Sequence, residues 1–135
     1  MSTALTFAIM DAPFENSRTV TMFRIVAAAL AAGHDVNVFA YEGAVALSFA
    51  RQAPHANAVH GRDAAQENHP LPRLWIESLL ALAAKHGRKL DWVNCGLCVD
   101  ERGVAEAIDG VRRGTPADFW KMSVDSGNTL TAGTR

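Results

Sequence analysis

Apolar and polar positions alternate in blocks along the chain, and the blocks predict strands and helices in turn. The first run, LTFAIM, is short and apolar and is stopped by Asp11, which is typical of a buried strand followed by a loop. Apolar residues then recur at helical spacing in NSRTVTMFRIVAAALAAGH, where Asn16 or Ser17 can cap the helix and Gly33 can end it. DVNVFAY follows as a second strand. Together these elements predict a βαβ unit, which requires a parallel sheet with a right-handed crossover.

The remainder of the chain repeats this alternation after a less regular middle part. EGAVALSFARQ is compatible with a short helix, and APHANAVHGRDAAQENHPLP predicts a long surface segment at the rim of any pocket. PLPRLWIESLLALAAKHG carries an apolar helical stripe that Gly87 ends, and LDWVNC predicts a third strand that finishes at Cys95. VAEAIDGVRRG again has apolar residues at helical spacing, Thr115 and Pro116 open a further helix, and NTLTAG predicts an edge strand.

The pattern as a whole predicts an α/β fold. We expect three α/β/α layers around a mainly parallel sheet of about five strands. Because the chain has 135 residues and neither a linker nor an internal repeat, we expect a single domain over residues 1–135. Sites in open α/β sheets collect at the carboxyl ends of the strands. Cys95, at the end of the third expected strand, is therefore the first candidate for a functional residue.

Composition and charge narrow the classes of protein to which the chain can belong. With 49% hydrophobic and 20% charged residues, the chain is expected to form a packed core. A formal net charge of -1 gives no general attraction for nucleic acid or an anionic membrane, so we expect neither as a direct partner. The N-terminus has no basic region before its apolar run, which does not fit an export signal. We therefore expect a cytoplasmic protein, in a compartment where a close cysteine pair is more often reactive or metal-binding than a structural disulfide.

The two cysteines, Cys95 and Cys98, lie in the sequence CGLC and admit four interpretations. A structural zinc site needs four ligands, so His55, His60 or His69 would have to complete it from the long middle segment, which could also fold over the cysteine loop. A redox couple of the thioredoxin type usually stands earlier in its domain than after a third strand. The pair could also be two small buried residues of the core. The fourth interpretation is a nucleophilic thiolate that carries sulfur.

The local sequence around Cys95 suits a nucleophilic thiolate. The cysteine follows a strand, Gly96 allows a close approach of the backbone, and helical residues are expected from Val99 onward. Arg102 is near enough in sequence to face the same anion. We therefore take Cys95 and Cys98 as candidate catalytic residues, with Gly96 and Arg102 as candidate substrate-binding residues, and we expect no metal ligand.

These residues also resemble a known family. The stretches FAIM, GHDVNVFAYEGAV and LAAKHG, and above all the spacing of Cys95 from the Arg102–Gly103 pair, are similar to those of the DsrE/DsrF/TusD-like sulfur-relay proteins. The resemblance extends from about Thr6 to Gly103 and becomes thin after it. It implies that Cys95, rather than Cys98, stands at the position that carries a persulfide.

The resemblance implies a function and partners for the chain. Such proteins are small α/β domains that assemble as trimers or hexamers and pass persulfide sulfur from a donor protein to an acceptor protein without a cofactor. Cys98 departs from the best-known members, and it could either accept the sulfur or release it as sulfide with formation of a Cys95–Cys98 disulfide. The alternative function is an oligomeric ligand-binding or redox-sensing module that uses the two thiols without sulfur transfer.

Overall fold

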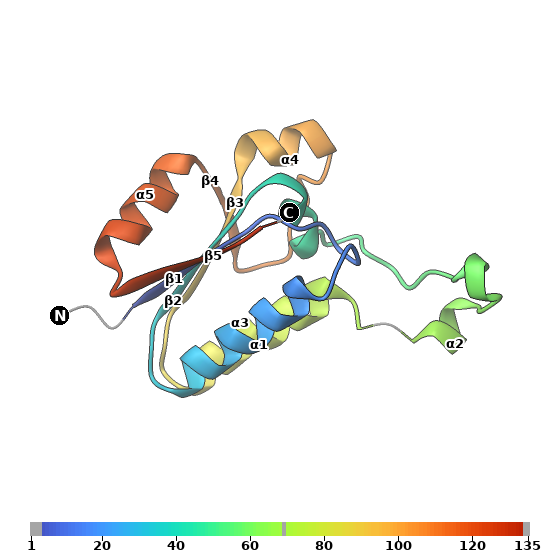
Figure 1. The fold of residues 1–135 in the computed structure, drawn as a ribbon, viewed down its shortest axis with the longest axis horizontal. Helices are drawn as coiled ribbons and strands as arrows, with labels where there is room; N and C mark the ends of the chain where they lie inside the picture. Colours follow the sequence, from blue (N-terminus) through green and yellow to red (C-terminus); the bar gives the residue numbers. More distant parts are fainter. Residues whose placement is uncertain (1–3, 69, 134–135) are drawn as a thin grey trace.

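Five parallel strands form the central sheet in the computed structural model, which describes residues 4–68 and 70–133 (Figure 1). From one edge to the other they run in the order β4, β3, β2, β1, β5. The strands are β1 (Leu5–Ile9), β2 (Val36–Ala40), β3 (Leu90–Cys95), β4 (Val111–Gly114) and β5 (Asn128–Ala132). Each neighbouring pair is parallel, so the prediction of an α/β fold with a mainly parallel sheet is confirmed.

Helices cover both faces of the sheet and give the molecule three layers (Figure 1). One face carries α1 (Arg18–Ala31) and α3 (Pro72–Lys85), and the other carries α4 (Gly96–Arg102) and α5 (Pro116–Asp125). The larger core cluster lies on the side of α1 and α3 and contains the fully buried Leu30 and Trp92. The smaller cluster lies on the side of α4 and α5 and contains both cysteines. Among the described residues, no helix is long and apolar enough to cross a membrane.

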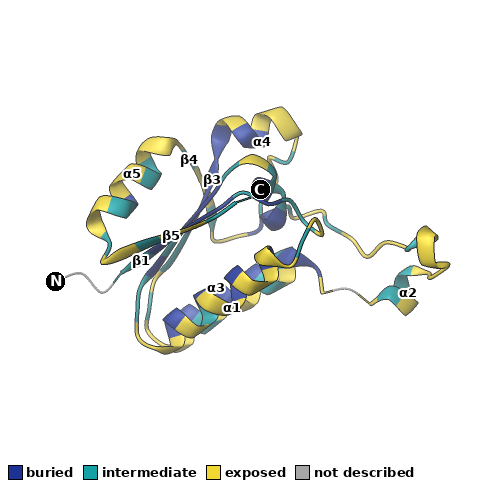
Figure 2. Ribbon diagram, viewed as in Figure 1, coloured by how far each residue is buried: buried dark blue, intermediate teal, exposed yellow. Residues whose placement is uncertain are grey.

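The strands in the middle of the sheet are buried, whereas the edge strands are partly exposed (Figure 2). In β1 only Leu5 is incompletely buried, but no residue of β5 is buried. Since helices cover both faces of a parallel sheet, its central strands must be almost continuously apolar. This explains why LTFAI is an apolar run and why NTLTA, the predicted edge strand, is mostly polar.

The ends of the long helices follow the capping signals of the sequence. The side chain of Asn16 accepts a hydrogen bond from the backbone N–H of Arg18 at 2.8 Å, and Ser17 occupies the N-cap position of α1 without a capping bond from its own side chain. After α1, Gly33 adopts a φ of +94°, and after α3, Gly87 adopts a φ of +63°. These left-handed conformations are accessible to glycine without strain, which is why both helices end there.

The helix expected in VAEAIDGVRRG is wrong. Gly103 ends α4 with a φ of +64°, and the chain then runs without helix to β4. The backbone groups of this connection bond to the segment after β2: Ile108 N–H donates to Ser48 O at 2.9 Å, and Ala50 N–H donates to Glu106 O at 2.7 Å. Tertiary contacts thus replace the hydrogen bonds that a helix would have formed.

The irregular middle part begins at the sheet and then projects from it (Figure 1). Its first element is the 3-10 helix η1 (Glu42–Ser48), where a short helix was expected. The projecting part carries η2 (Ala58–His60) and α2 (Ala64–Glu67), and most of its residues are exposed. It extends away from α4 instead of folding over the cysteine loop (Figure 1).

Candidate functional site

Cys95 is the last residue of β3, and α4 begins at the next residue. In the parallel register between β3 and β4, Cys95 lies beside Gly114. The residue is only 7% exposed and belongs to the smaller core cluster, yet it borders a surface pocket of about 340 Å³. The pocket is lined by Cys95, Gly96, Leu97, Arg113, Gly114, Thr115 and Pro116. The cysteine is therefore not sealed inside the core.

Gly96, the first residue of α4, makes room for the side chain of Arg113. A Cβ atom added to Gly96 would lie 2.7 Å from Nε of Arg113. Unbonded heavy atoms do not approach one another so closely, so any larger residue at this position would displace the guanidinium. The missing side chain lets Arg113 lie against the backbone that joins β3 to α4.

Arg113 is held in place by the carboxylate of Asp100, one turn further along α4. Nη1 and Nη2 donate to the two carboxylate oxygens, the first at 2.9 Å. The hydrogen bonds from Arg113 lower the pKa of Asp100, and the same bonds raise the pKa of Arg113, with a smaller contribution from the charge of Cys95. Both side chains are more than half exposed, so the pair adds little to stability. The main effect of the pair is to hold the positively charged guanidinium of Arg113 beside the cysteine.

Cys98 lies in the first turn of α4 and is buried. Its sulfur accepts a hydrogen bond from the backbone N–H of Glu42, with 3.1 Å between N and Sγ. Burial raises the pKa of the Cys98 thiol, and a hydrogen bond to Cys95 and the negative charges of Cys95 and Glu42 raise it further, whereas the N–H of Glu42 lowers it. Both cysteines are free thiols. Cys98 is thus a thiol that holds its proton more firmly than an ordinary cysteine.

Arg102, the last residue of α4, extends toward Glu42 rather than toward the pocket. Its Nη2 donates to Glu42 Oε2 at 3.1 Å, and its Nη1 donates to the carbonyl oxygen of Cys98 at 3.3 Å. A second carboxylate, that of Glu101, is 3.7 Å from Nη1. These contacts connect α4 to η1 beside the second cysteine. The electrostatic role expected for Arg102 stays a prediction.

The histidines considered as further ligands lie elsewhere or outside the described residues. His55 packs edge-on against Phe14, with ring centroids 5.3 Å apart, and His60 belongs to η2 on the projecting segment. His69 lies outside the described residues. Within residues 4–68 and 70–133, no three side chains of His, Cys, Asp or Glu gather as a group that could hold a metal ion. The described part of the chain therefore adds no further ligand to the cysteine pair.

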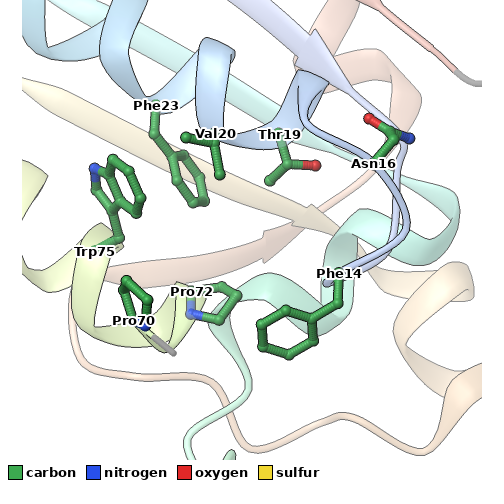
Figure 3. Close-up of a pocket in the computed structure, with 8 residues that line it drawn as sticks. All are labelled: Phe14, Asn16, Thr19, Val20, Phe23, Pro70, Pro72 and Trp75. Atoms are coloured by element: carbon green, nitrogen blue, oxygen red, sulfur yellow. The ribbon is translucent and has the colours of Figure 1, made fainter. Parts of the chain in front are cut away.

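A second pocket, of about 180 Å³, lies on the other side of the sheet, where α1 and α3 begin (Figure 3). Figure 3 shows the side chains that line it: Phe14, Asn16, Thr19, Val20, Phe23, Pro70, Pro72 and Trp75. They are mostly apolar and include neither a charged group nor a cysteine or histidine. This pocket offers contact area without a nucleophile, unlike the pocket that Cys95 borders.

Sequence reasoning does not identify two residues of this site, Arg113 and Glu42. The first was assigned to a helix, whereas the strand β4 brings it to the same sheet edge as Cys95. Interpreting VRRG as a strand that ends at Gly114 would have revealed this neighbour, because parallel strands meet at their carboxyl ends. Glu42 gave a weaker signal, which is only that it directly follows the expected strand DVNVFAY.

The chain belongs to the DsrE/DsrF-like family. The model of this family matches residues 3–131, which is almost the whole sequence and includes the loop between Gly103 and β4 as well as α5. The resemblance noted in the sequence is thereby confirmed. Comparison with curated proteins found no match.

Two solved structures show the same fold. The YchN protein of E. coli is 19% identical, with a TM-score of 0.72, and the match covers 98% of this chain and 100% of YchN. BT1422 of Bacteroides thetaiotaomicron, a conserved protein of unknown function, is 12% identical, with a TM-score of 0.58 and coverage of 96% and 94%. At these identities the similarity concerns the fold alone.

Proposed function

We propose that this protein is a sulfurtransferase or sulfur carrier that holds sulfur as a persulfide on Cys95 and passes it to a protein thiol. The observation that carries the proposal is the position of Cys95 at the end of β3, beside an open pocket, in a chain of the DsrE/DsrF-like family. A carrier thiol must be ionised and reachable. Arg113 places a guanidinium in the same pocket, where it can meet an anionic sulfur.

The proposed reaction consists of two exchanges of one S–S bond for another. In loading, the Cys95 thiolate attacks the outer sulfur of a donor persulfide, R–S–SH. The donor S–S bond breaks, its electron pair leaves on the donor thiolate, and the proton stays on the outer sulfur of Cys95–S–SH. In unloading, an acceptor thiolate attacks that outer sulfur and the Cys95 thiolate leaves. Each step breaks one S–S bond and forms another, so there is no net oxidation or reduction. Thiol exchange alone therefore completes the cycle.

Cys98 has two candidate roles beside this cycle. It can accept the outer sulfur in a short internal transfer, or it can attack the Cys95 sulfur of the loaded persulfide. In the second case the outer S–S bond breaks, the outer sulfur leaves as hydrosulfide and takes up the Cys98 proton, and a Cys95–Cys98 disulfide remains. A dithiol reductant must then restore the two thiols. The raised pKa lowers the thiolate fraction of Cys98 at neutral pH, which slows its attack in both cases and supports Cys95 as the residue that carries the sulfur.

The proposed partners are sulfur donor and acceptor proteins that dock on the face formed by α4 and α5. Leu97 lines the pocket and is 68% exposed, and Trp120 on α5 is 73% exposed. Large exposed apolar side chains beside a reactive thiol support a protein contact. We further propose a cytoplasmic homo-oligomer, a trimer or hexamer, without a membrane or direct nucleic-acid partner. Light scattering on the purified protein measures the oligomer.

The test of the carrier function is sulfur uptake by the reduced protein. The chain has two cysteines, so Cys98→Ser leaves Cys95 as its single thiol. After incubation with inorganic polysulfide, intact and peptide masses should show one added sulfur atom in the wild type and in Cys98→Ser, and none in Cys95→Ser. A donor-treated wild type without an adduct, or an adduct that survives Cys95→Ser, contradicts the proposal.

A second candidate function is a redox-sensing or ligand-binding module without sulfur transfer. The positions of the two free thiols favour it, because Cys95 and Cys98 belong to the same core cluster and neighbouring sulfurs can form a disulfide. The measurement is equilibration with mixtures of oxidised and reduced glutathione, followed by the mass of the alkylated protein. Reversible formation of a Cys95–Cys98 disulfide together with a failure to take up sulfur would support this alternative.

A further inference from the structure

Arg113 brings a positive charge into the Cys95 pocket. Among the described residues that line the pocket, it is the one charged side chain. It precedes Gly114, the strand neighbour of Cys95, and its guanidinium lies against the backbone at Gly96. The charge is therefore fixed at the point where β3 ends and α4 begins.

The two other arginines of this region are directed elsewhere. Arg112, the preceding residue on β4, donates to both carboxylate oxygens of Asp91, at 2.9 and 3.0 Å. Arg102 donates to Glu42. Neither lines the pocket. Arg112 is thus a matched control for Arg113, because it has the same charge, the neighbouring position and a similar exposure.

We propose that Arg113 is the anion-binding residue of this pocket and holds the negatively charged outer sulfur of a persulfide or polysulfide at Cys95, with Asp100 as the carboxylate that positions the guanidinium. The inference rests on the proposed function, because it concerns the loaded form of the same cysteine. The ligand class is a small anionic sulfur chain. Leu97 and Pro116 give the pocket apolar walls, which suit polarizable sulfur better than a strongly hydrated oxyanion.

When the loaded Cys95–S–SH gives up its proton to solvent, the negative charge of the persulfide lies one S–S bond, about 2.05 Å, outward from the Cys95 sulfur. Arg113 can follow this charge because its side chain is 53% exposed and is not packed into the core. A guanidinium has five N–H donors, so one can remain on Asp100 while another reaches the outer sulfur. The amino end of α4 is a weaker source of stabilisation, since the helix has only 7 residues.

The experiment compares Arg113→Gln, Arg113→Lys and the control Arg112→Gln in the full chain that carries Cys98→Ser. The first measurement is the rate of Cys95 alkylation by iodoacetamide at neutral pH, which needs no sulfur donor. We expect Arg113→Gln to slow it about three- to tenfold, Arg113→Lys to slow it less, and Arg112→Gln to leave it unchanged. The second measurement is the lifetime of the sulfur adduct formed with inorganic polysulfide, which Arg113→Gln should shorten by a similar factor.

Asp100→Asn provides an independent variant, because it removes the carboxylate that positions the Arg113 guanidinium and should slow alkylation as Arg113→Gln does. It tests the inference even if Arg113→Gln does not fold. Equal alkylation rates in Arg113→Gln and Arg112→Gln, with an unchanged rate in Asp100→Asn, would overturn the inference. A wild-type chain that takes up no sulfur overturns the carrier function and, with it, the sulfur ligand of Arg113. A wild type that takes up sulfur, with an Arg113→Gln variant that holds it equally long, overturns this inference alone.

Discussion

The backbone N–H of Glu42 donates a hydrogen bond to the sulfur of Cys98 over 3.1 Å. Glu42 follows β2 and Cys98 follows β3, so the bond joins segments at the carboxyl ends of two neighbouring strands. Glu42 adopts a φ of +51° at this point. A residue with a Cβ atom adopts such a conformation at a cost of about 1–2 kcal/mol. The backbone is thus strained at Glu42, the residue whose N–H donates to the sulfur of Cys98.

This strain predicts a difference between two substitutions of Glu42. Glu42→Gly and Glu42→Ala both keep the backbone N–H, and both remove the carboxylate that pairs with Arg102. Only glycine adopts the positive φ without strain, so the glycine variant should exceed the alanine variant in free energy of unfolding by about 1 kcal/mol. Urea unfolding measures the difference. A glycine variant that is no more stable than the alanine variant would contradict a strained backbone at this position.

The raised pKa of Cys98 predicts a loss of stability in alkaline solution. Burial raises the pKa of Cys98 above 9.0, and burial together with the charge of Glu42 raises the pKa of Tyr41 above 10.0. Below these values both groups are protonated in the folded and the unfolded states, and their contribution is complete. As the pH rises, the unfolded state loses its protons first, so the free energy of unfolding falls.

Cys98→Ser should remove the part of the alkaline decrease in free energy of unfolding that comes from the thiol. The part that comes from Tyr41 should remain. The measurement is urea unfolding of both proteins, in the reduced state, at a series of pH values from neutral to about one unit above the ordinary thiol value. An equally steep fall in wild type and in Cys98→Ser would show that the folded protein does not retain the Cys98 proton.

Gly96→Ala should disturb the pocket without unfolding the chain. The added Cβ would meet Nε of Arg113, which is near the free end of a flexible side chain and can move away. The stability should therefore stay within about 1 kcal/mol of the wild type, with the better helix propensity of alanine acting in its favour. In the Cys98→Ser background, alkylation of Cys95 should slow as it does in Arg113→Gln. A normal alkylation rate would mean that the guanidinium does not need its place against Gly96.

Asp118 predicts a contribution to stability that is lost in acid. The backbone N–H of Thr115 donates to Asp118 at 2.8 Å and lowers its pKa, and Arg112 adds to the effect. A carboxyl group of this kind contributes stability above its ordinary value of 3.8, and the contribution is lost as the pH falls through the lowered value. Asp118→Asn should be less stable at neutral pH and less sensitive to acid. Thermal unfolding at pH values from neutral down to about two units below that ordinary value checks both effects.

The layers of the fold were predictable because the central strands and the long helices carry strong local signals. LTFAI and VNVFA are buried on both faces of the sheet, and α1 and α3 end at glycines with positive φ. The strand β4 was not predictable in the same way. It has four residues, VRRG, of which none is buried, and its place is set by pairing with β3.

In the candidate site, too, the residues with local signals were predictable and those placed by strand pairing were not. Cys95 could be selected from the sequence because an apolar strand before it and a glycine after it are both local features. Arg113 and Glu42 reach the cysteines from strands that lie on either side of β3, so their positions depend on the order of the sheet. The order of the sheet is a property of the whole chain, and a single stretch of residues does not encode it.

The first and last strands of the chain, β1 and β5, lie side by side and run in the same direction (Figure 1). Because all strands are parallel, β1 begins at the end of the sheet opposite the cysteines, and β5 finishes at the end where β3 reaches Cys95. A purification tag or fluorescent label fused beyond β5 would begin at the same end of the sheet as Cys95, whereas one fused ahead of β1 would begin at the opposite end. Binding and uptake experiments are best designed with the fusion at the beginning of the chain.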